Sequence, residues 1–227
     1  MAASPSGSPP SRAARLVTPF LWNPGQHMAI IGMTDSGKST LISRLTEDRA
    51  YLLVLRTKLD SVKWPNTRVI TKATQLDDPR INRCELRPAF ERQQVEFAHA
   101  LDKVWKMGAF TVVVDETHMV DGELGLRPLL NRLLQQGRDP GRISMVCGMQ
   151  RPSTVTRFAI GEASHVISFG LEGRDVTILE QATNKRMGEV VENLPDHHFA
   201  WMSRKQRKAL WTGRLNLKSG QLIGRSL

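Results

Sequence analysis

The residues best suited to chemistry lie in the stretch Gly32–Ser39, GMTDSGKS, which fits the pattern G-x-x-x-x-G-K-[ST]. Glycines allow a tight turn whose backbone N–H groups point inward, and the N-terminus of a following helix adds a partial positive charge. Lys38 would reach the β- and γ-phosphates of a nucleotide, and the hydroxyl of Ser39 would ligate Mg²⁺. The expected nucleotide-binding residues are Thr34, Asp35, Ser36, Gly37, Lys38, Ser39 and Thr40. The alternative is a Gly/Ser turn that only caps a helix.

A pair of acids, Asp115 and Glu116, follows the buried apolar run FTVVV. A carboxylate at the end of such a strand emerges at the carboxyl edge of a sheet, where Asp115 could share an Mg²⁺ ion with Ser39. Glu116 is then placed to orient or deprotonate an attacking water, which would turn phosphate binding into hydrolysis. The alternative for Glu116 is an exposed loop acid or a residue that helps to cap a helix.

Gln150 ends the next apolar strand, ISMVCGM. Its neutral amide can accept from water and donate to a γ-phosphate oxygen, so we predict a sensor role, against the alternative of a helix cap. Hydrolysis also needs positive charge on the transferred phosphoryl group. For that role the segment QQGRDPGRISM offers Arg138, then Arg142, acting on the nucleotide of a neighbouring subunit, with Arg151 and Arg157 further on. Each of these four could instead be an ordinary surface arginine.

The elements that must position these residues alternate between strand and helix patterns. Apolar strands are expected at 27–31, 50–57, 68–71, 109–116, 143–149 and 165–170, and helices at 38–47, 90–106, 126–134 and 152–160. Such alternation predicts an α/β fold with a mostly parallel central sheet and helices on both faces. We expect an ATPase domain over residues 17–196, a disordered Ser/Pro/Ala/Arg-rich tail over 1–16, and a basic C-terminal extension over 197–227.

The placement of charge suggests a polyanionic partner. The chain of 227 residues has a net charge of +10, and seven of these charges lie in residues 197–227, which contain no acidic residue. The alternative is a solvated basic tail. That extension is expected to form two short strands around a charged turn, in which Trp201 and Trp211 either stack on bases or pack in the core.

The sequence shows no 18-residue apolar run and no apolar signal-peptide centre, so we expect a cytoplasmic protein. Cys84 and Cys147 are expected to be buried, reduced thiols rather than a disulfide or a metal site.

Three segments, GMTDSGKST, TVVVDE and GRDPGRISMVCGMQRPSTVTR, together resemble the FtsK–HerA superfamily of P-loop ATPases, and most of all its viral genome-packaging members. The likeness covers roughly Met28 to Phe169. It implies a RecA-like (ASCE) sheet, ATP and Mg²⁺ as cofactors, a homo-oligomeric ring with nucleotide between subunits, and movement of double-stranded DNA. A packaging role further implies action in the host cytoplasm or on the virion, with a capsid vertex or membrane-associated virion proteins as partners. DNA contacts would be to the backbone.

Asp35 departs from this pattern, because the family usually has another glycine there. A carboxylate near bound phosphate is repelled, so we expect its side chain to face away or to be paired. Candidate pore loops are TKLDSVKWPN, with Lys58, Lys63 and Trp64, and THMVDGELGLR, with Arg127. The alternative functions are a conjugation, secretion or filamentous-virus assembly motor, a P-loop nucleotide kinase, or a nucleotide switch that does not hydrolyse.

Overall fold

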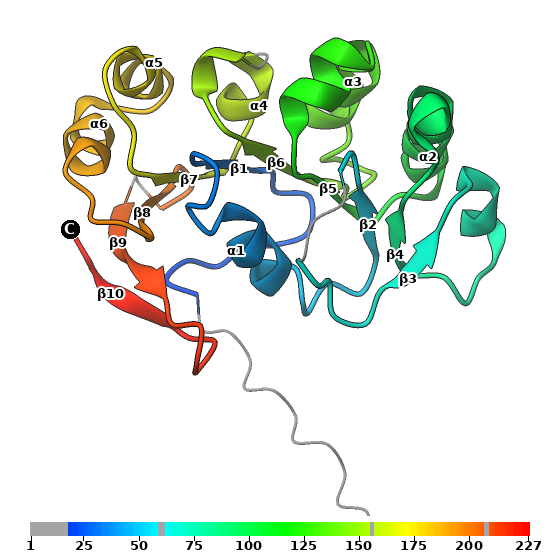
Figure 1. The fold of residues 1–227 in the computed structure, drawn as a ribbon, viewed down its shortest axis with the longest axis horizontal. Helices are drawn as coiled ribbons and strands as arrows, with labels where there is room; N and C mark the ends of the chain where they lie inside the picture. The colour runs from blue at the N-terminus through cyan, green and yellow to red at the C-terminus, as the bar shows by residue number, and fades with distance from the viewer. Residues whose placement is uncertain (1–17, 59–61, 155–156, 207–208) are drawn as a thin grey trace, which may run out of the picture.

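The computed structural model describes residues 18–58, 62–154, 157–206 and 209–227 (Figure 1). The tail predicted to be disordered, residues 1–16, lies outside this part of the chain, as does part of the charged turn expected between the C-terminal strands. Within it, none of the helices is long and apolar enough to cross a membrane.

One sheet runs through the described molecule, with the strand order β10-β9-β8-β7-β1-β6-β5-β2-β4-β3. Neighbouring strands from β7 to β3 are parallel, and β8, β9 and β10 continue the sheet as antiparallel strands. The predicted mostly parallel sheet with a small C-terminal β extension is therefore confirmed. The strands are β1 Met28–Ile31, β2 Leu52–Leu55, β3 Arg68–Ile70, β4 Arg83–Leu86, β5 Thr111–Val114, β6 Ser144–Met149, β7 His165–Phe169, β8 His198–Ser203, β9 Ala209–Leu215 and β10 Leu222–Ser226.

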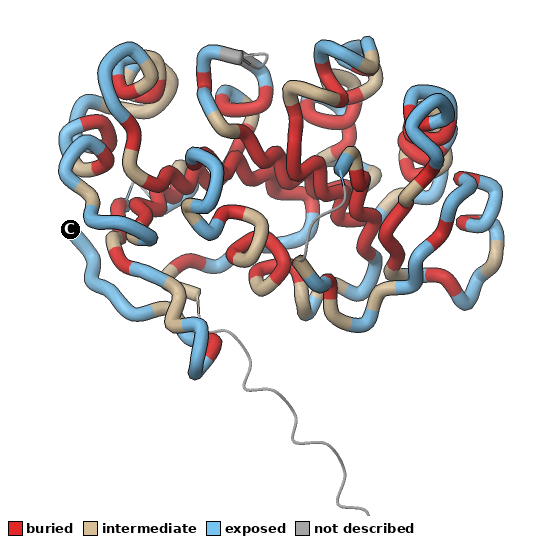
Figure 2. The backbone as a smooth tube through the Cα atoms, viewed as in Figure 1, coloured by how far each residue is buried: buried red, intermediate tan, exposed pale blue. Residues whose placement is uncertain are grey.

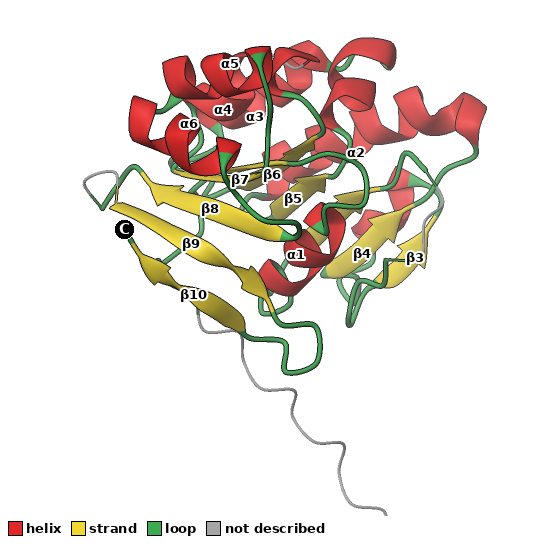
Figure 3. Cartoon of the chain, turned by 60° about the vertical axis from the view of Figure 1, so that its left-hand side comes forward, coloured by secondary structure: helices red, strands yellow, loops and turns green. Residues whose placement is uncertain are grey.

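Helices cover both faces of the sheet, as predicted, but unevenly. In Figures 1 and 3, α1 lies on one face and α2 to α6 lie on the other. The α-helices are α1 Lys38–Leu45, α2 Gln93–Met107, α3 Arg127–Gln136, α4 Arg157–Gly161, α5 Arg174–Ala182 and α6 Lys185–Glu192. Short 3₁₀ turns occupy Ala73–Asp77, Phe90–Arg92 and Pro152–Thr154, and a π-helical turn occupies Met119–Glu123.

The alternation of side chains along the strands divides the core into two parts. In β1, Met28 and Ile30 pack towards α1, whereas Ala29 and Ile31 join the larger core under α2 to α6. Figure 2 shows the buried backbone concentrated along the strands and on the inner sides of the helices. Both faces of the parallel strands are thus covered, which explains why β1, β2, β5 and β6 are buried along their whole length.

The order of the strands brings the candidate site residues to one edge of the sheet. β6 lies between β1 and β5, so the strand that leads into the glycine-rich loop and the strand that leads into the acid pair both flank the strand that leads into Gln150. All three are parallel and present their carboxyl ends at one edge.

The basic C-terminal extension is part of the core rather than a free tail. Trp201 is fully buried and Trp211 nearly so, and their rings contact Phe20 and Phe199 respectively. The guanidinium of Arg204 donates to the carbonyl oxygens of Ile160 and Ala182. The two tryptophans therefore pack, and base stacking by them is excluded.

Cys84 and Cys147 are free and buried, as predicted.

Candidate active site

The glycine-rich loop joins the end of β1 to the start of α1. Gly37 adopts φ +93° as the N-cap of α1, a conformation that favours glycine. A Cβ on Gly32 would lie 2.5 Å from the hydroxyl of Ser36 and 2.8 Å from the ring of Phe169, so a side chain does not fit there. These two glycines give the loop the curvature that points its backbone N–H groups inward.

The backbone conformation at Asp35 shows why an aspartate can stand where the family usually has a glycine. Its φ is +63°, in the left-handed region that glycine enters freely and that aspartate tolerates better than most residues. Its side chain is exposed. Asp35 nevertheless helps to line the phosphate cavity described below, and the loop keeps the turn that a glycine would give.

Ser39 and Asp115, which are distant in sequence, meet at the mouth of the loop. The hydroxyl of Ser39 donates to Asp115 Oδ2 across 2.6 Å. Asp115 is only 5% exposed, and its Oδ1 has no hydrogen-bond partner among the described residues. A buried carboxylate oxygen without a partner is costly unless something else binds it. Two hard oxygen donors side by side fit Mg²⁺, which commonly takes one or two protein groups and completes its shell with phosphates and water.

Glu116 is 7% exposed and is held by three neighbours. Its Oε1 accepts from the ammonium of Lys58 and, at 3.4 Å, from the amide of Gln150. Its Oε2 lies 3.8 Å from His118 Nε2. Burial by itself raises the pKa of Glu116, but the hydrogen bond and positive charge of Lys58, with smaller effects from Lys38 and Gln150, outweigh it and leave the pKa below its ordinary value. The carboxylate is therefore ionised at neutral pH.

A cavity of about 300 Å³ lies beside these groups, since Ser39, Lys58 and Gln150 line it and bond to Asp115 or Glu116. It is lined by the loop residues from Met33 to Thr40 other than Ser36, together with Lys58, Val62 and Gln150. Two lysines and the N-terminus of α1 make the cavity positive, which suits a chain of phosphates. The structure therefore brings together the predicted loop residues, Asp115, Glu116 and Gln150, while their roles remain predictions.

The two preferred arginines, Arg138 and Arg142, lie elsewhere. Arg138 and Arg142 precede β6, whereas Gln150 follows it, so six strand residues, about 20 Å, separate them from the cavity. Arg138 is half-buried and donates to the carbonyl oxygen of Glu162, whereas Arg142 is exposed. Neither can reach this chain's own nucleotide. Arg151 follows Gln150 and so lies at the same edge of the sheet as the cavity, where it faces Asp175 at 4.0 Å. Arg157 is the first residue of α4.

Lys58 is the residue of the site that sequence reasoning misassigned, because the loop that contains it was predicted to face a DNA pore. β2 pairs with β5, so a residue shortly after β2 lies beside one shortly after β5, and that pairing brings Lys58 to Glu116. In the same loop Trp64 is 4% exposed and packs in the core beneath α1. Arg127, the other pore-loop candidate, pairs with the buried Asp121 at 2.9 Å.

The chain shares its fold with solved P-loop NTPases, among them a viral genome-packaging NTPase and a conjugation coupling protein. The solved genome packaging NTPase B204 of Sulfolobus turreted icosahedral virus 2, in complex with AMPPCP, matches it with a TM-score of 0.66 and 15% sequence identity, over 84% of this chain and 98% of that chain. The DNA-packaging ATPase B204 of Sulfolobus turreted icosahedral virus matches with a TM-score of 0.65 and 18% identity, over the same shares. The pCW3 conjugation coupling protein TcpA, solved with ATPγS, matches with a TM-score of 0.52 and 17% identity, over 78% of this chain and 57% of that chain.

No protein-family model matches the chain, and no curated protein matches it in sequence.

Proposed function

We propose that the chain is a Mg²⁺-dependent ATPase that moves double-stranded DNA, and that it packages a viral genome into a capsid. The observation that carries the hydrolytic part is the hydrogen bond from Ser39 to Asp115, with Glu116 held beside it at the mouth of the glycine-rich loop. Proteins of the same fold have been solved with AMPPCP and ATPγS, which supports a nucleoside triphosphate as the ligand.

The residues divide the chemistry between them. The loop N–H groups and Lys38 would hold the β- and γ-phosphates, and Ser39 and Asp115 would hold Mg²⁺. When bound, that ion neutralises charge on the β- and γ-oxygens. Gln150 would orient the attacking water, whose oxygen bonds to the γ-phosphorus as the bond to the β-γ bridging oxygen breaks. Glu116 would accept the proton of the water.

The low pKa of Glu116 makes it a weak base, yet this is compatible with hydrolysis. Phosphoryl transfer passes through a loose transition state in which the water is only slightly deprotonated, so position matters more than basicity. Glu116 and Gln150 also argue against a kinase, which must exclude water from the γ-phosphate.

The motor part of the proposal rests on likeness and charge. The packaging NTPase B204 is matched over nearly its whole length, whereas the conjugation coupling protein is matched over little more than half of its chain. A packaging motor is therefore favoured over a conjugation motor. The proposal includes a homo-oligomeric ring around DNA, in the host cytoplasm or at a capsid vertex, where virion proteins would anchor it.

The decisive experiment measures phosphate release with and without duplex DNA, for the wild type, Lys38→Ala and Glu116→Gln. We expect DNA to raise the rate of the wild type, Lys38→Ala to lose turnover, and Glu116→Gln to bind ATP while hydrolysing it at least about 100-fold more slowly. Full activity of Glu116→Gln would contradict the assigned role of that residue. Hydrolysis that duplex DNA leaves unchanged would favour a motor that acts on another polymer.

A further inference from the structure

The phosphate cavity is too small for a whole nucleotide. Its volume of about 300 Å³ is at the lower end of ligand sites. Gln150 lines this cavity and donates to Glu116, so the proposed function places the γ-phosphate beside these two residues. The base of the nucleotide must therefore extend out of the phosphate cavity on the side away from the γ-phosphate. That side lies along the first turn of α1, where Gly37 and Thr40 lie. Two larger cavities adjoin the loop, and they differ in charge.

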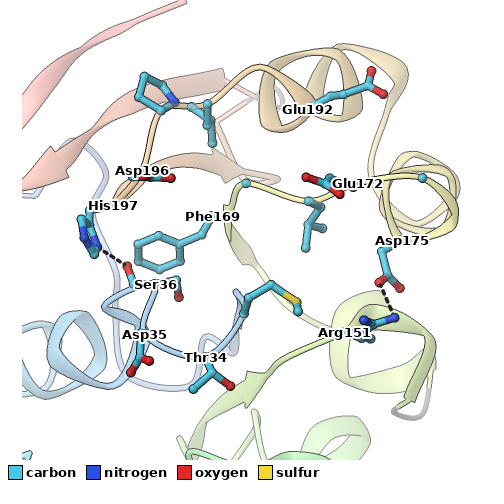
Figure 4. A pocket seen from close by; sticks show the side chains of 16 residues that line it. Thr34, Asp35, Ser36, Arg151, Phe169, Glu172, Asp175, Glu192, Asp196 and His197 are labelled. Carbon is cyan, nitrogen blue, oxygen red and sulfur yellow. Dashed lines mark hydrogen bonds and ion pairs between the residues drawn. The ribbon is translucent and has the colours of Figure 1, made fainter.

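The first adjoining cavity, of about 760 Å³, is unsuited to a nucleotide (Figure 4). Five carboxylates line it, against one arginine and one histidine: Asp35, Glu172, Asp175, Glu192 and Asp196. In Figure 4 these acids surround the opening, and Arg151 is already paired with Asp175. A triphosphate would be repelled from this side. The cavity also borders Arg151, next to Gln150, and so lies towards the γ-phosphate end.

The second adjoining cavity, of about 620 Å³, carries much less negative charge, because Asp35 is the one carboxylate among the described residues of its lining, against Arg214 and Lys218. It shares Asp35, Gly37 and Thr40 with the phosphate cavity and does not reach Gln150. Phe169, which is almost completely buried and in edge-to-face contact with the fully buried Phe199, belongs to the apolar part of its lining. The end of β9 and the turn that follows contribute the rest of the lining.

The turn after β9 carries an exposed leucine, Leu217. Leu217 is 77% exposed, although it lines a cavity together with Leu215. Large exposed apolar side chains beside a cleft are typical of binding surfaces. Arg214 and Lys218 flank the two leucines and supply positive charge. The combination suits a flat, largely apolar group attached to an anion.

The turn is held in place before any ligand binds. The N–H groups of Lys218 and Gly220 donate to Asn216, through its side-chain Oδ1 and its backbone oxygen respectively. Gly220 adopts φ +68°, and a Cβ there would lie 2.0 Å from the guanidinium of Arg44, so the turn rests directly on α1. A fixed turn keeps Leu217 beside Thr40, which limits the entropy lost on binding.

We propose that this second cavity binds the base of the nucleotide whose phosphates occupy the glycine-rich loop, with the base against Leu215 and Leu217. The proposal rests on the proposed ATPase function and assigns the C-terminal β extension to nucleotide binding rather than to DNA alone.

The test compares two ligands on the same variants. Isothermal titration calorimetry would measure the Kd of Mg-ATP and of inorganic tripolyphosphate, which has no base, for the wild type, Leu217→Ser and Leu217→Glu. We expect Leu217→Ser to weaken ATP binding about fivefold to tenfold through lost apolar contact. Leu217→Glu should weaken ATP binding further, because a carboxylate placed against the base must lose its hydration, and both variants should bind tripolyphosphate as the wild type does. Leu21→Ser, at a leucine that is 68% exposed and outside these cavities, should bind both ligands normally.

A second measurement locates the base directly. Photolysis of bound azidoadenosine triphosphate should label the peptide that contains Leu215 to Lys218, and labelling beside Glu172 to Asp175 would overturn the proposal. Unchanged ATP binding in both Leu217 variants, or equal loss of ATP and tripolyphosphate, would also overturn it. These failures differ from failure of the ATPase function itself, in which the wild type would bind neither ligand or Lys38→Ala would hydrolyse normally.

Discussion

At the scale of single residues, Glu116 and Lys58 form the contact with the largest consequence for rate. The ammonium of Lys58 keeps Glu116 ionised, but it also occupies one of the two oxygens that could receive a proton. The other oxygen, Oε2, faces His118 at 3.8 Å. Lys58 therefore fixes both the charge of the carboxylate and the oxygen that it presents to water.

The first prediction of this scale concerns pH. Glu116 must be ionised to act, so turnover falls as pH falls through its pKa, which Lys58 holds below the ordinary value. Lys58→Met removes that positive charge and should move the acid limb of kcat to higher pH. The measurement is kcat against pH at saturating Mg-ATP. Lys63→Met, at an exposed lysine of the same loop, serves as the control. An acid limb that stays in place in Lys58→Met would show that this contact does not set the charge of Glu116.

The sequence predicted the residues whose positions follow from loop spacing and strand ends, and it missed the contacts that depend on the order of the strands. Ser39, Asp115 and Gln150 follow from a fixed loop spacing and from the ends of strongly apolar strands, which meet at one edge in any parallel sheet. Lys58 depends on β2 lying next to β5, and strand order is not visible in periodicity. The hydrogen bond from Arg138 to the carbonyl oxygen of Glu162 likewise joins residues that come together only in the folded chain.

At the scale of elements, the strands and helices with strong apolar patterns were predicted, and those with weak patterns were missed. β4 carries Arg83 and Glu85, and Glu85 is buried only because Arg56 and Arg87 face it. β10 is largely exposed and has no apolar alternation. α5 and α6 were not predicted, although α1, which has eight residues like α6, was predicted from the glycine-rich loop before it.

Gly148 shows how an element positions the site. It lies in β6 where the strand passes the end of β5, and a Cβ there would lie 2.4 Å from the carbonyl oxygen of Asp115. The contact is with backbone, so Gly148→Ala must push β5 and β6 apart at the acid pair. We expect a loss of about 1–3 kcal/mol in the free energy of unfolding, measured by denaturant titration.

The same displacement should reduce turnover more than stability alone explains, since a shift of about 1 Å at a reacting group can cost about 100-fold in rate. Phosphate release by folded Gly148→Ala, measured well below its melting temperature, would show this. Gly161→Ala is the control, because a Cβ at Gly161 meets no atom within 4 Å. A fully active and stable Gly148→Ala would mean that the end of β5 tolerates movement.

At the scale of the whole molecule, the candidate catalytic residues lie at one edge of the sheet, and Arg138 and Arg142 lie at the other. A ring joins two different surfaces of the same chain, so an arginine far from its own site can approach the site of a neighbour. The structure favours Arg142 over Arg138 for this role. Arg142 is exposed and adopts φ +51°, a strained conformation for a residue of its kind, whereas Arg138 is bound within its own chain.

This argument predicts complementation between inactive subunits. Arg142→Ala and Lys38→Ala should each lose hydrolysis alone, the first because the neighbour's arginine is missing and the second because the phosphate site is missing. In an equal mixture, about a quarter of the interfaces join an intact phosphate loop to an intact Arg142, so phosphate release should recover to about a quarter of the wild-type rate. Arg138→Ala should keep hydrolysis on its own, because Arg138 bonds to Glu162 within its own subunit, and mixing it with Lys38→Ala should give no gain over the share of Arg138→Ala subunits present. Recovery with Arg138→Ala and not with Arg142→Ala would reverse the assignment, and recovery with neither would place the nucleotide away from a subunit interface.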